Sequence, residues 1–164
     1  MIRISSCVAV LSLGFAFCSC NEVSAQQDTT PGQTGRVEPE YLTSPATTKL
    51  NRPFSEAVRV GPTLYLSGFT GRIPGTNTVV PGGIQAETRQ VMENIGGALE
   101  RYGSDFGHVV KCTVMLLDMK EWASMNEVYR TYFPQDRMPA RSAFGANGLA
   151  FGARVEIECL ATMK

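Results

Sequence analysis

Two charged residues in the C-terminal part of the sequence are the strongest candidates for chemistry. Arg141 stands in the segment PARSAF (residues 139–144), whose small side chains let a guanidinium lie close to the backbone. The planar fork of an arginine matches a carboxylate bidentately, so this position is suited to binding a small acid. Glu156 alternates with Val155 and Ile157 on a predicted strand. That pattern fits either a carboxylate on a solvated sheet face or a buried acid.

Other catalytic groups are scarce. The single histidine, His108, follows Gly107 just beyond a predicted helix, where a solvated or capping role is expected. One such imidazole is a poor basis for a histidine triad or a histidine-rich metal site. The sequence also lacks the glycine-rich phosphate loop of nucleotide hydrolases.

The charge balance narrows the choice of partners. The 164 residues contain 15 Lys+Arg and 15 Asp+Glu, and the sequence pI is about 6.6. Proteins that bind nucleic acid or anionic membranes through a general electrostatic field carry a basic excess. We therefore expect no nucleic-acid partner and a small-molecule ligand chosen by local charges.

The five cysteines fall into two groups. Cys7, Cys18 and Cys20 lie in the first twenty residues, and only Cys112 and Cys159 lie in the remaining 144. A disulfide scaffold needs a denser and more regular set. Since both later cysteines lie in predicted strands without a neighbouring histidine or a Cys-x-x-Cys partner, we interpret them as two buried free thiols.

The N-terminus has the pattern of a secretory signal peptide over residues 1–25. Arg3 supplies a positive charge, residues 8–17 are apolar or small, and Val23-Ser24-Ala25 is a small-x-small cleavage site. The apolar run is too short for a membrane span, so we expect export to the periplasm or the extracellular space. Lipoprotein maturation with acylation at Cys20 is the alternative processing route, and a buried N-terminal helix is the alternative without export.

The chain after this segment divides into a leader and one domain. Residues 26–48 are rich in Gln, Thr, Pro and Gly and lack an apolar period, which indicates an exposed leader or linker. Residues 49–164 form the predicted domain. Its expected elements are strands over 57–60 and 63–68, a loop over 72–83, a helix over 84–102, a strand over 109–117, a helix over 118–133, a strand from residue 140 and a last strand over 153–162.

Specific residues mark the ends of the two helices. Gly103 stands where a helix C-cap is expected, and Asp118 with Glu121 resembles a capping box. The order ββαβαββ predicts an α/β (α+β) fold in which two helices pack on one face of a mixed sheet. On the last strand the other face carries Glu156, Glu158 and Leu160, so it must be wet or covered by a partner.

Five ordered motifs resemble the RidA (YjgF) family, the reactive intermediate deaminases. They span about Pro53 to Met163 and comprise residues 64–68 (LYLSG), 88–94 (TRQVMEN), 109–114 (VVKCTV), 125–129 (MNEVY) and the block from PARS (139–142) to VEI (155–157). The resemblance implies a chorismate-mutase-like fold, a homotrimer and ligand clefts between subunits. It also implies hydrolysis of reactive enamine and imine acids, namely 2-aminoacrylate and 2-iminopropanoate or 2-iminobutanoate, to 2-oxo acids and ammonia without a metal or an organic cofactor.

The same resemblance assigns roles to individual residues. The essential arginine of the family falls on Arg141, which would bind the substrate carboxylate. Its acid falls on Glu156, which would orient or activate water. The pocket asparagine falls on Asn126, and Gly68 matches a strand-end glycine that leaves space beside the ligand.

Three positions depart from the family pattern. Phe54 replaces a pocket tyrosine, Ala143 replaces a cysteine two residues after the arginine, and Phe69 stands where deaminases often have glutamine. We therefore expect a pocket more apolar than the family archetype, one that accepts a bulkier substrate side chain.

Three functions remain in competition on the sequence. The first is an exported imine deaminase. The second is a non-catalytic protein that binds small carboxylates or 2-oxo acids through Arg141. The third, the endoribonuclease activity attributed to some family members, is disfavoured by the zero net charge.

Overall fold

The computed structural model describes residues 36–164, which form one compact unit. The predicted signal peptide, Cys20 and residues 26–35 lie outside the described residues. The strands are β1 (Glu40–Leu42), β2 (Ala57–Val60), β3 (Thr63–Leu66), β4 (Phe69–Thr70), β5 (Val109–Leu116), β6 (Ala140–Gly145) and β7 (Val155–Thr162). The α-helices are α1 (Pro45–Lys49), α2 (Gly83–Arg101) and α3 (Trp122–Tyr129), and short 3₁₀ turns cover Phe106–His108, Met119–Glu121, Arg130–Tyr132 and Ala150–Gly152.

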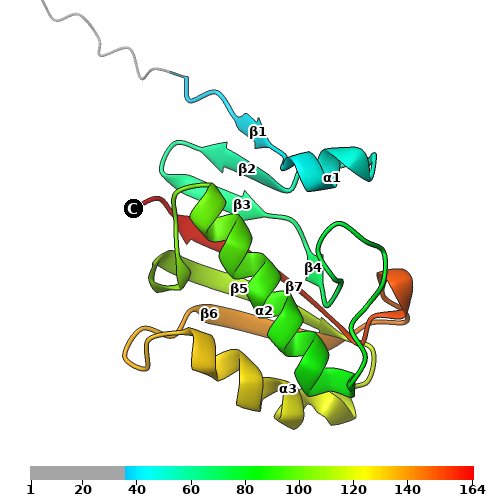
Figure 1. Cartoon of the computed structure of the whole chain (residues 1–164). Helices are drawn as coiled ribbons and strands as arrows, with labels where there is room; N and C mark the ends of the chain where they lie inside the picture. The colour runs from blue at the N-terminus through cyan, green and yellow to red at the C-terminus, as the bar shows by residue number, and fades with distance from the viewer. Residues whose placement is uncertain (1–35) are drawn as a thin grey trace, which may run out of the picture. The chain divides into compact units, whose positions relative to one another are not determined.

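All seven strands form one mixed sheet with the order β1-β2-β3-β7-β5-β6, and β4 pairs with the other end of β7. β5 and β6 are parallel, and the other pairs are antiparallel. The longer helices α2 and α3 lie together on one face of the sheet (Figure 1). The predicted architecture of two helices on one face of a mixed sheet is confirmed.

The side of the sheet under the helices is the hydrophobic core. β7 alternates as predicted: its buried residues Val155, Ile157, Cys159 and Ala161 face the helices, and they pack against the apolar stripe of α2. α2 ends as predicted, because Gly103 adopts a left-handed φ of +84° directly after the C-cap residue. The opposite face of β7 carries Glu156, Glu158 and Leu160 and has no helix over it (Figure 1).

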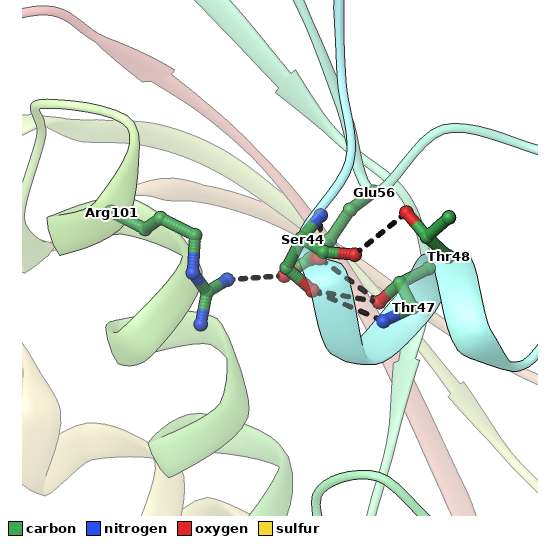
Figure 2. A network of polar contacts seen from close by, with 5 residues as sticks. All are labelled: Ser44, Thr47, Thr48, Glu56 and Arg101. Atoms are coloured by element: carbon green, nitrogen blue, oxygen red, sulfur yellow. Dashed lines mark hydrogen bonds and ion pairs between the residues drawn. The ribbon is translucent and has the colours of Figure 1, made fainter.

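The leader prediction over 26–48 is wrong for the part that the structure describes. β1 adds an edge strand to β2, and α1 follows with Ser44 as its N-cap. Buried Glu56, which is 7% exposed, holds this segment: its carboxylate accepts hydrogen bonds from the Ser44 backbone N–H and the Thr47 hydroxyl, and from Arg101 of α2 at 2.6 Å (Figure 2). The sequence pattern did not predict these elements because β1 and α1 are both short. In addition, α1 is held by polar contacts and has no apolar stripe.

The prediction of two free thiols is also wrong, because Cys112 and Cys159 form a disulfide. The two residues are directly opposite each other on the neighbouring antiparallel strands β5 and β7. They lie on the helix-covered face, so the bridge crosses two central strands inside the core. Strand order, which the sequence does not state, brings the two positions together.

The start of the second helix also differs from the prediction. Asp118 caps a 3₁₀ turn by accepting the Lys120 N–H at 2.9 Å, and α3 begins at Trp122. Glu121 does not complete a capping box; its carboxylate binds Arg154 instead. His108 pairs with Asp105 at 2.7 Å in a partly exposed position, as expected for a solvated histidine.

Candidate active site

Arg141 lies at the start of β6, two residues after Pro139, on the face that carries the helices. Its backbone is in register with buried Cys112 of β5, so the two side chains share that face. α3 positions the guanidinium: Asn126 accepts a hydrogen bond from it at 2.6 Å, and the ring of Tyr129 lies 4.7 Å away. This contact places Asn126 beside Arg141, and the expected role of Asn126 in a substrate pocket remains a prediction.

The guanidinium of Arg141 has no carboxylate partner among residues 36–164. It opens into a cavity of about 380 Å³ lined by Asn126, Tyr129, Arg130, Met138, Pro139 and Arg141. Burial raises the pKa of Tyr129 to about 12, which keeps its ring a neutral platform for the cation. An oriented arginine without a counter-ion is suited to binding the carboxylate of a ligand.

Ala143 follows two residues later on the same face of β6 and packs partly buried against the core. Its methyl group offers no thiol or other reactive group at this position. The structure therefore gives Ala143 only the role of an apolar wall near Arg141. Its expected place in a pocket remains a prediction.

Glu156 lies on the opposite face of the sheet, in the middle of the strand order. Its direct neighbours across the ladder are Met115 of β5 and Thr70 of β4. Burial raises the pKa of Glu156, the nearby carboxylate of Glu158 raises it further, and the guanidinium of Arg72 opposes both. A carboxylate with a raised pKa is suited to accepting and returning a proton near neutral pH.

Gly68 provides the space that Glu156 occupies. A Cβ atom at residue 68 would lie 2.9 Å from the carboxyl carbon Cδ of Glu156 and 3.1 Å from its Cγ. Both distances are shorter than an ordinary carbon–carbon contact of about 3.5–4.0 Å. The side chain of Glu156 thus occupies the space that the missing side chain of Gly68 leaves, and it would have to shift if residue 68 carried a Cβ. The expected role of Gly68 beside a ligand remains a prediction.

Phe54 lies in a segment that hydrogen bonds to the residue before Gly68. The hydroxyl of Ser67 donates to the Ser55 carbonyl at 2.7 Å, and the Ser67 N–H donates to the Glu56 carbonyl at 3.0 Å. The Phe54 ring is half exposed. It lines a surface depression together with residues around α1, among them Thr47 and Asn51, and its expected place in the substrate pocket remains a prediction.

Phe69 does not belong to this group. It pairs with Ile157, which faces the helices, and it packs against the hydrophobic core. Phe69 and Glu156 therefore lie on opposite faces of the sheet. Side chains alternate across a strand, so Phe69 does not lie beside Glu156 of the same chain, and its expected place in the substrate pocket remains a prediction.

The predicted catalytic pair is thus split within one chain. Arg141 shares the helix-covered face with Cys112, whereas Glu156 shares the other face with Met115. In addition, β5 lies between β6, which carries Arg141, and β7, which carries Glu156. The chain contains two half-sites: Arg141 with Asn126 and Tyr129, and Glu156 with Gly68. The alternation of the last strand indicated that Glu156 lies on the face without helices, but nothing in the sequence indicated that Arg141 lies on the other face.

Two further cations that the sequence analysis did not single out lie near the second half-site. Arg72, in the loop after β4, donates from Nε to the hydroxyl of Thr70, the cross-strand neighbour of Glu156, at 3.1 Å. Arg52, from the segment before β2, lies over the same aromatic ring as Arg72, that of Phe151. Arg52, Arg72 and Phe151 come from three separate loops. The only indication in the sequence was that Arg72 lies in a predicted loop rich in Gly and Pro.

Among the described residues, no helix is long and apolar enough to cross a membrane. Nor do residues 36–164 contain a cluster of three or more His, Cys, Asp or Glu suited to holding a metal ion.

Known proteins match this chain over most of its described part. The profile of the Endoribonuclease L-PSP family matches residues 45–163. The mouse 2-iminobutanoate/2-iminopropanoate deaminase is 46% identical over 109 residues, which cover 66% of this chain and 80% of the mouse protein. The human protein of that name is 41% identical over 66% of this chain and 79% of its own length.

Solved structures agree with the sequence matches. The crystal structure of RidA from an Antarctic Psychrobacter species has a TM-score of 0.65 and 32% identity, and the match covers 78% of this chain and 98% of that one. A YjgF-family protein from Neisseria meningitidis has a TM-score of 0.64 and 28% identity over 79% and 98% of the two chains. The chain therefore belongs to the RidA (YjgF) family, to which the Endoribonuclease L-PSP profile corresponds.

Proposed function

We propose that this protein hydrolyses reactive 2-imino acids, and the enamines in equilibrium with them, to 2-oxo acids and ammonia. The observation that carries the proposal is the guanidinium of Arg141, fixed by Asn126 and stacked on Tyr129, with no carboxylate partner in residues 36–164. Relatives that are 41–46% identical bear the name 2-iminobutanoate/2-iminopropanoate deaminase, which supports this choice of reaction.

The active site is completed by a second copy of the chain. Arg141 and Glu156 lie on opposite faces of one sheet, so a ligand bound to one Arg141 does not meet the Glu156 of the same chain. The face without helices is suited to contact another subunit: Tyr65 and Phe144 are exposed, and a depression of about 470 Å³ lies over β3, β5 and β7. We propose a homotrimer whose clefts combine the Arg141 half-site of one subunit with the Glu156 half-site of its neighbour.

The reaction in such a cleft needs only groups that the chain provides. Arg141 binds the substrate carboxylate and thereby fixes the imine carbon. Glu156 accepts a proton from water while the water oxygen bonds to that carbon. The imine reacts in its protonated form, so this addition gives a neutral carbinolamine. Glu156 then returns the proton to nitrogen, the C–N bond breaks, and ammonia leaves while Glu156 takes the hydroxyl proton and the C=O bond of the 2-oxo acid forms. The ammonia carries that proton away as ammonium. Orientation and a preorganised charge supply the acceleration in this scheme.

We further propose that the protein is exported after removal of residues 1–25. The Cys112–Cys159 disulfide supports this localisation, because structural disulfides form and persist in oxidising compartments. N-terminal sequencing of the protein recovered from its host tests the route. A start at Gln26 supports signal-peptide cleavage, whereas an acylated start at Cys20 supports lipoprotein maturation, and a start at Met1 contradicts export.

A second candidate function is binding of small carboxylates without catalysis. Phe54 favours it, because this side chain lacks the hydroxyl that the family has at the matching position. Arg141 would serve such a binding protein equally well.

A trapping assay separates the two functions. An amino-acid oxidase generates 2-iminopropanoate in the presence of semicarbazide, which captures the imine. We expect the wild-type protein to lower the yield of the captured product and Arg141→Ala to have no effect on it, with Arg89→Ala, an exposed arginine of α2, as the matched control. If wild type and Arg141→Ala give equal yields while only wild type binds 2-oxobutanoate by calorimetry, the binding function is correct and the deaminase is not.

A further inference from the structure

Arg52 and Arg72 approach one aromatic ring from different segments of the chain. Each guanidinium carbon lies 4.9 Å from the centroid of the Phe151 ring. Arg72 is fixed by hydrogen bonds to the Thr70 hydroxyl at 3.1 Å and to the Thr76 carbonyl at 3.2 Å. Arg52 donates to the side chain of Asn77 at 2.5 Å. Two like charges are therefore held close together on one half-exposed ring.

This cation pair is on the same side of the sheet as Glu156. Thr70 and Glu156 are directly opposite each other in the β4–β7 ladder, so their side chains share a face. Because Arg72 binds the Thr70 hydroxyl, its guanidinium lies on that face as well. The effects of Arg72 on the pKa of Glu156, and of Glu156 on the pKa of Arg72, agree with this proximity.

The positive charge of the pair is only partly balanced, by Glu156 on the same face. Neither Arg52 nor Arg72 forms an ion pair within residues 36–164. The Nε of Arg52 is buried without a hydrogen-bond acceptor, and burial together with the charge of Arg52 lowers the pKa of Arg72. A buried donor and two neighbouring cations are unfavourable unless an anion joins them.

The backbone at Phe151 adds a cost of its own. Phe151 has φ 62° and ψ 20°, a left-handed conformation that is rare for a bulky side chain. Strain of this kind persists where the surrounding structure imposes it, and it is concentrated at functional sites. Here it places the ring against both guanidinium groups.

We propose that Arg52 and Arg72 bind a second carboxylate, at the end of the substrate side chain, so that the preferred substrates are dicarboxylic 2-imino acids. This inference rests on the proposed function, in which Arg141 of the neighbouring subunit binds the first carboxylate. The two arginines outweigh the single negative charge of Glu156 on this side of the cleft. A monocarboxylic imine acid leaves that excess uncompensated, whereas a dicarboxylic one neutralises it. In this proposal the Glu156 side of the cleft is cationic, in place of the more apolar pocket expected from the sequence.

Calorimetry with two stable 2-oxo acids of equal chain length tests the proposal. 2-Oxoglutarate and 2-oxopentanoate differ only in the terminal carboxylate. We expect wild type to bind 2-oxoglutarate about tenfold more tightly than 2-oxopentanoate, which is the gain in affinity that one charge-assisted hydrogen bond gives. In Arg72→Met the two affinities should become nearly equal, while 2-oxopentanoate binding is retained. Arg52→Leu should reduce the preference, and Arg89→Met, which removes an exposed arginine of α2, should leave it unchanged.

The outcomes separate this inference from the deaminase proposal. Equal affinities in wild type, or a preference that survives in both Arg72→Met and Arg52→Leu, overturn the second carboxylate site even if imine hydrolysis is observed. A preference that depends on Arg72 in a protein without imine hydrolysis supports the site and overturns the deaminase function. Thermal unfolding of each variant shows whether it is folded, and the retained binding of 2-oxopentanoate confirms this for Arg72→Met.

Discussion

Gly68→Ala is a substitution that moves the carboxylate of Glu156 while leaving the backbone in place. The added Cβ would lie 2.9 Å from the carboxyl carbon of Glu156. Since carbon atoms in contact are about 3.5–4.0 Å apart, that carboxyl carbon must move by roughly 1 Å. A misplacement of this size costs on the order of 10²-fold in rate. The corresponding increase in activation free energy is about 2.7 kcal/mol.

The effect should appear in kcat of imine hydrolysis and not in folding. The side chain of Glu156 can rotate away, and the φ of Gly68 is outside the left-handed region, so we expect a small change in thermal stability. Binding of 2-oxobutanoate should be retained, because Arg141 binds the carboxylate.

The matched control is Gly97→Ala in α2, where a Cβ meets no atom within 4 Å. This change should leave kcat unaltered and raise stability by about 0.5–1 kcal/mol. An unchanged kcat in Gly68→Ala would refute the placement of Glu156 beside the reacting carbon.

Three other predictions concern Glu156, the disulfide and Glu56. Because burial raises the pKa of Glu156, the apparent pKa of the acidic limb of the kcat–pH profile should lie above the ordinary glutamate value of about 4.3. Glu156→Gln should abolish turnover but keep 2-oxobutanoate binding. Loss of both turnover and binding would indicate a structural glutamate. The mature chain should react with a thiol reagent in denaturant only after reduction, and Cys112→Ala with Cys159→Ala should lower the free energy of unfolding by about 2–4 kcal/mol; thiols that react without reduction would contradict the disulfide. Burial opposes the charge of Glu56, but its hydrogen bonds and Arg101 lower its pKa overall, so Glu56 stabilises the fold above the ordinary glutamate pKa and this stabilisation is lost as pH falls through the folded-state value. Glu56→Gln should cost about 1–3 kcal/mol at pH 7 and reduce that pH dependence, and a melting curve identical to wild type would contradict it.

The central part of the fold was predictable because its patterns are local. The alternation along β7 and the apolar stripe of α2 identify their buried faces without knowledge of the neighbours. The motif resemblance identified the family and singled out Arg141 and Asn126, which the structure brings within hydrogen-bonding distance.

Features that depend on which strands are neighbours were not predictable. Cys112 and Cys159 are 47 residues apart, and only the β5–β7 register makes them partners. The alternation along β7 indicated the face of Glu156, but only the β5–β6 pairing places Arg141 on the opposite face of the sheet. The cation pair around Phe151 is built from three loops, whose relative placement has no sequence pattern.

The central claim is that each active site joins Arg141 of one subunit to Glu156 of another. Co-expression of Arg141→Ala and Glu156→Gln chains in equal amounts tests it directly, since each variant alone should be inactive in the semicarbazide assay. If subunits assort at random into trimers, about a quarter of the clefts receive both an intact arginine and an intact glutamate, so about a quarter of the wild-type activity should return. Mixed trimers, verified by differential affinity tags, that remain as inactive as either variant alone would contradict the shared site.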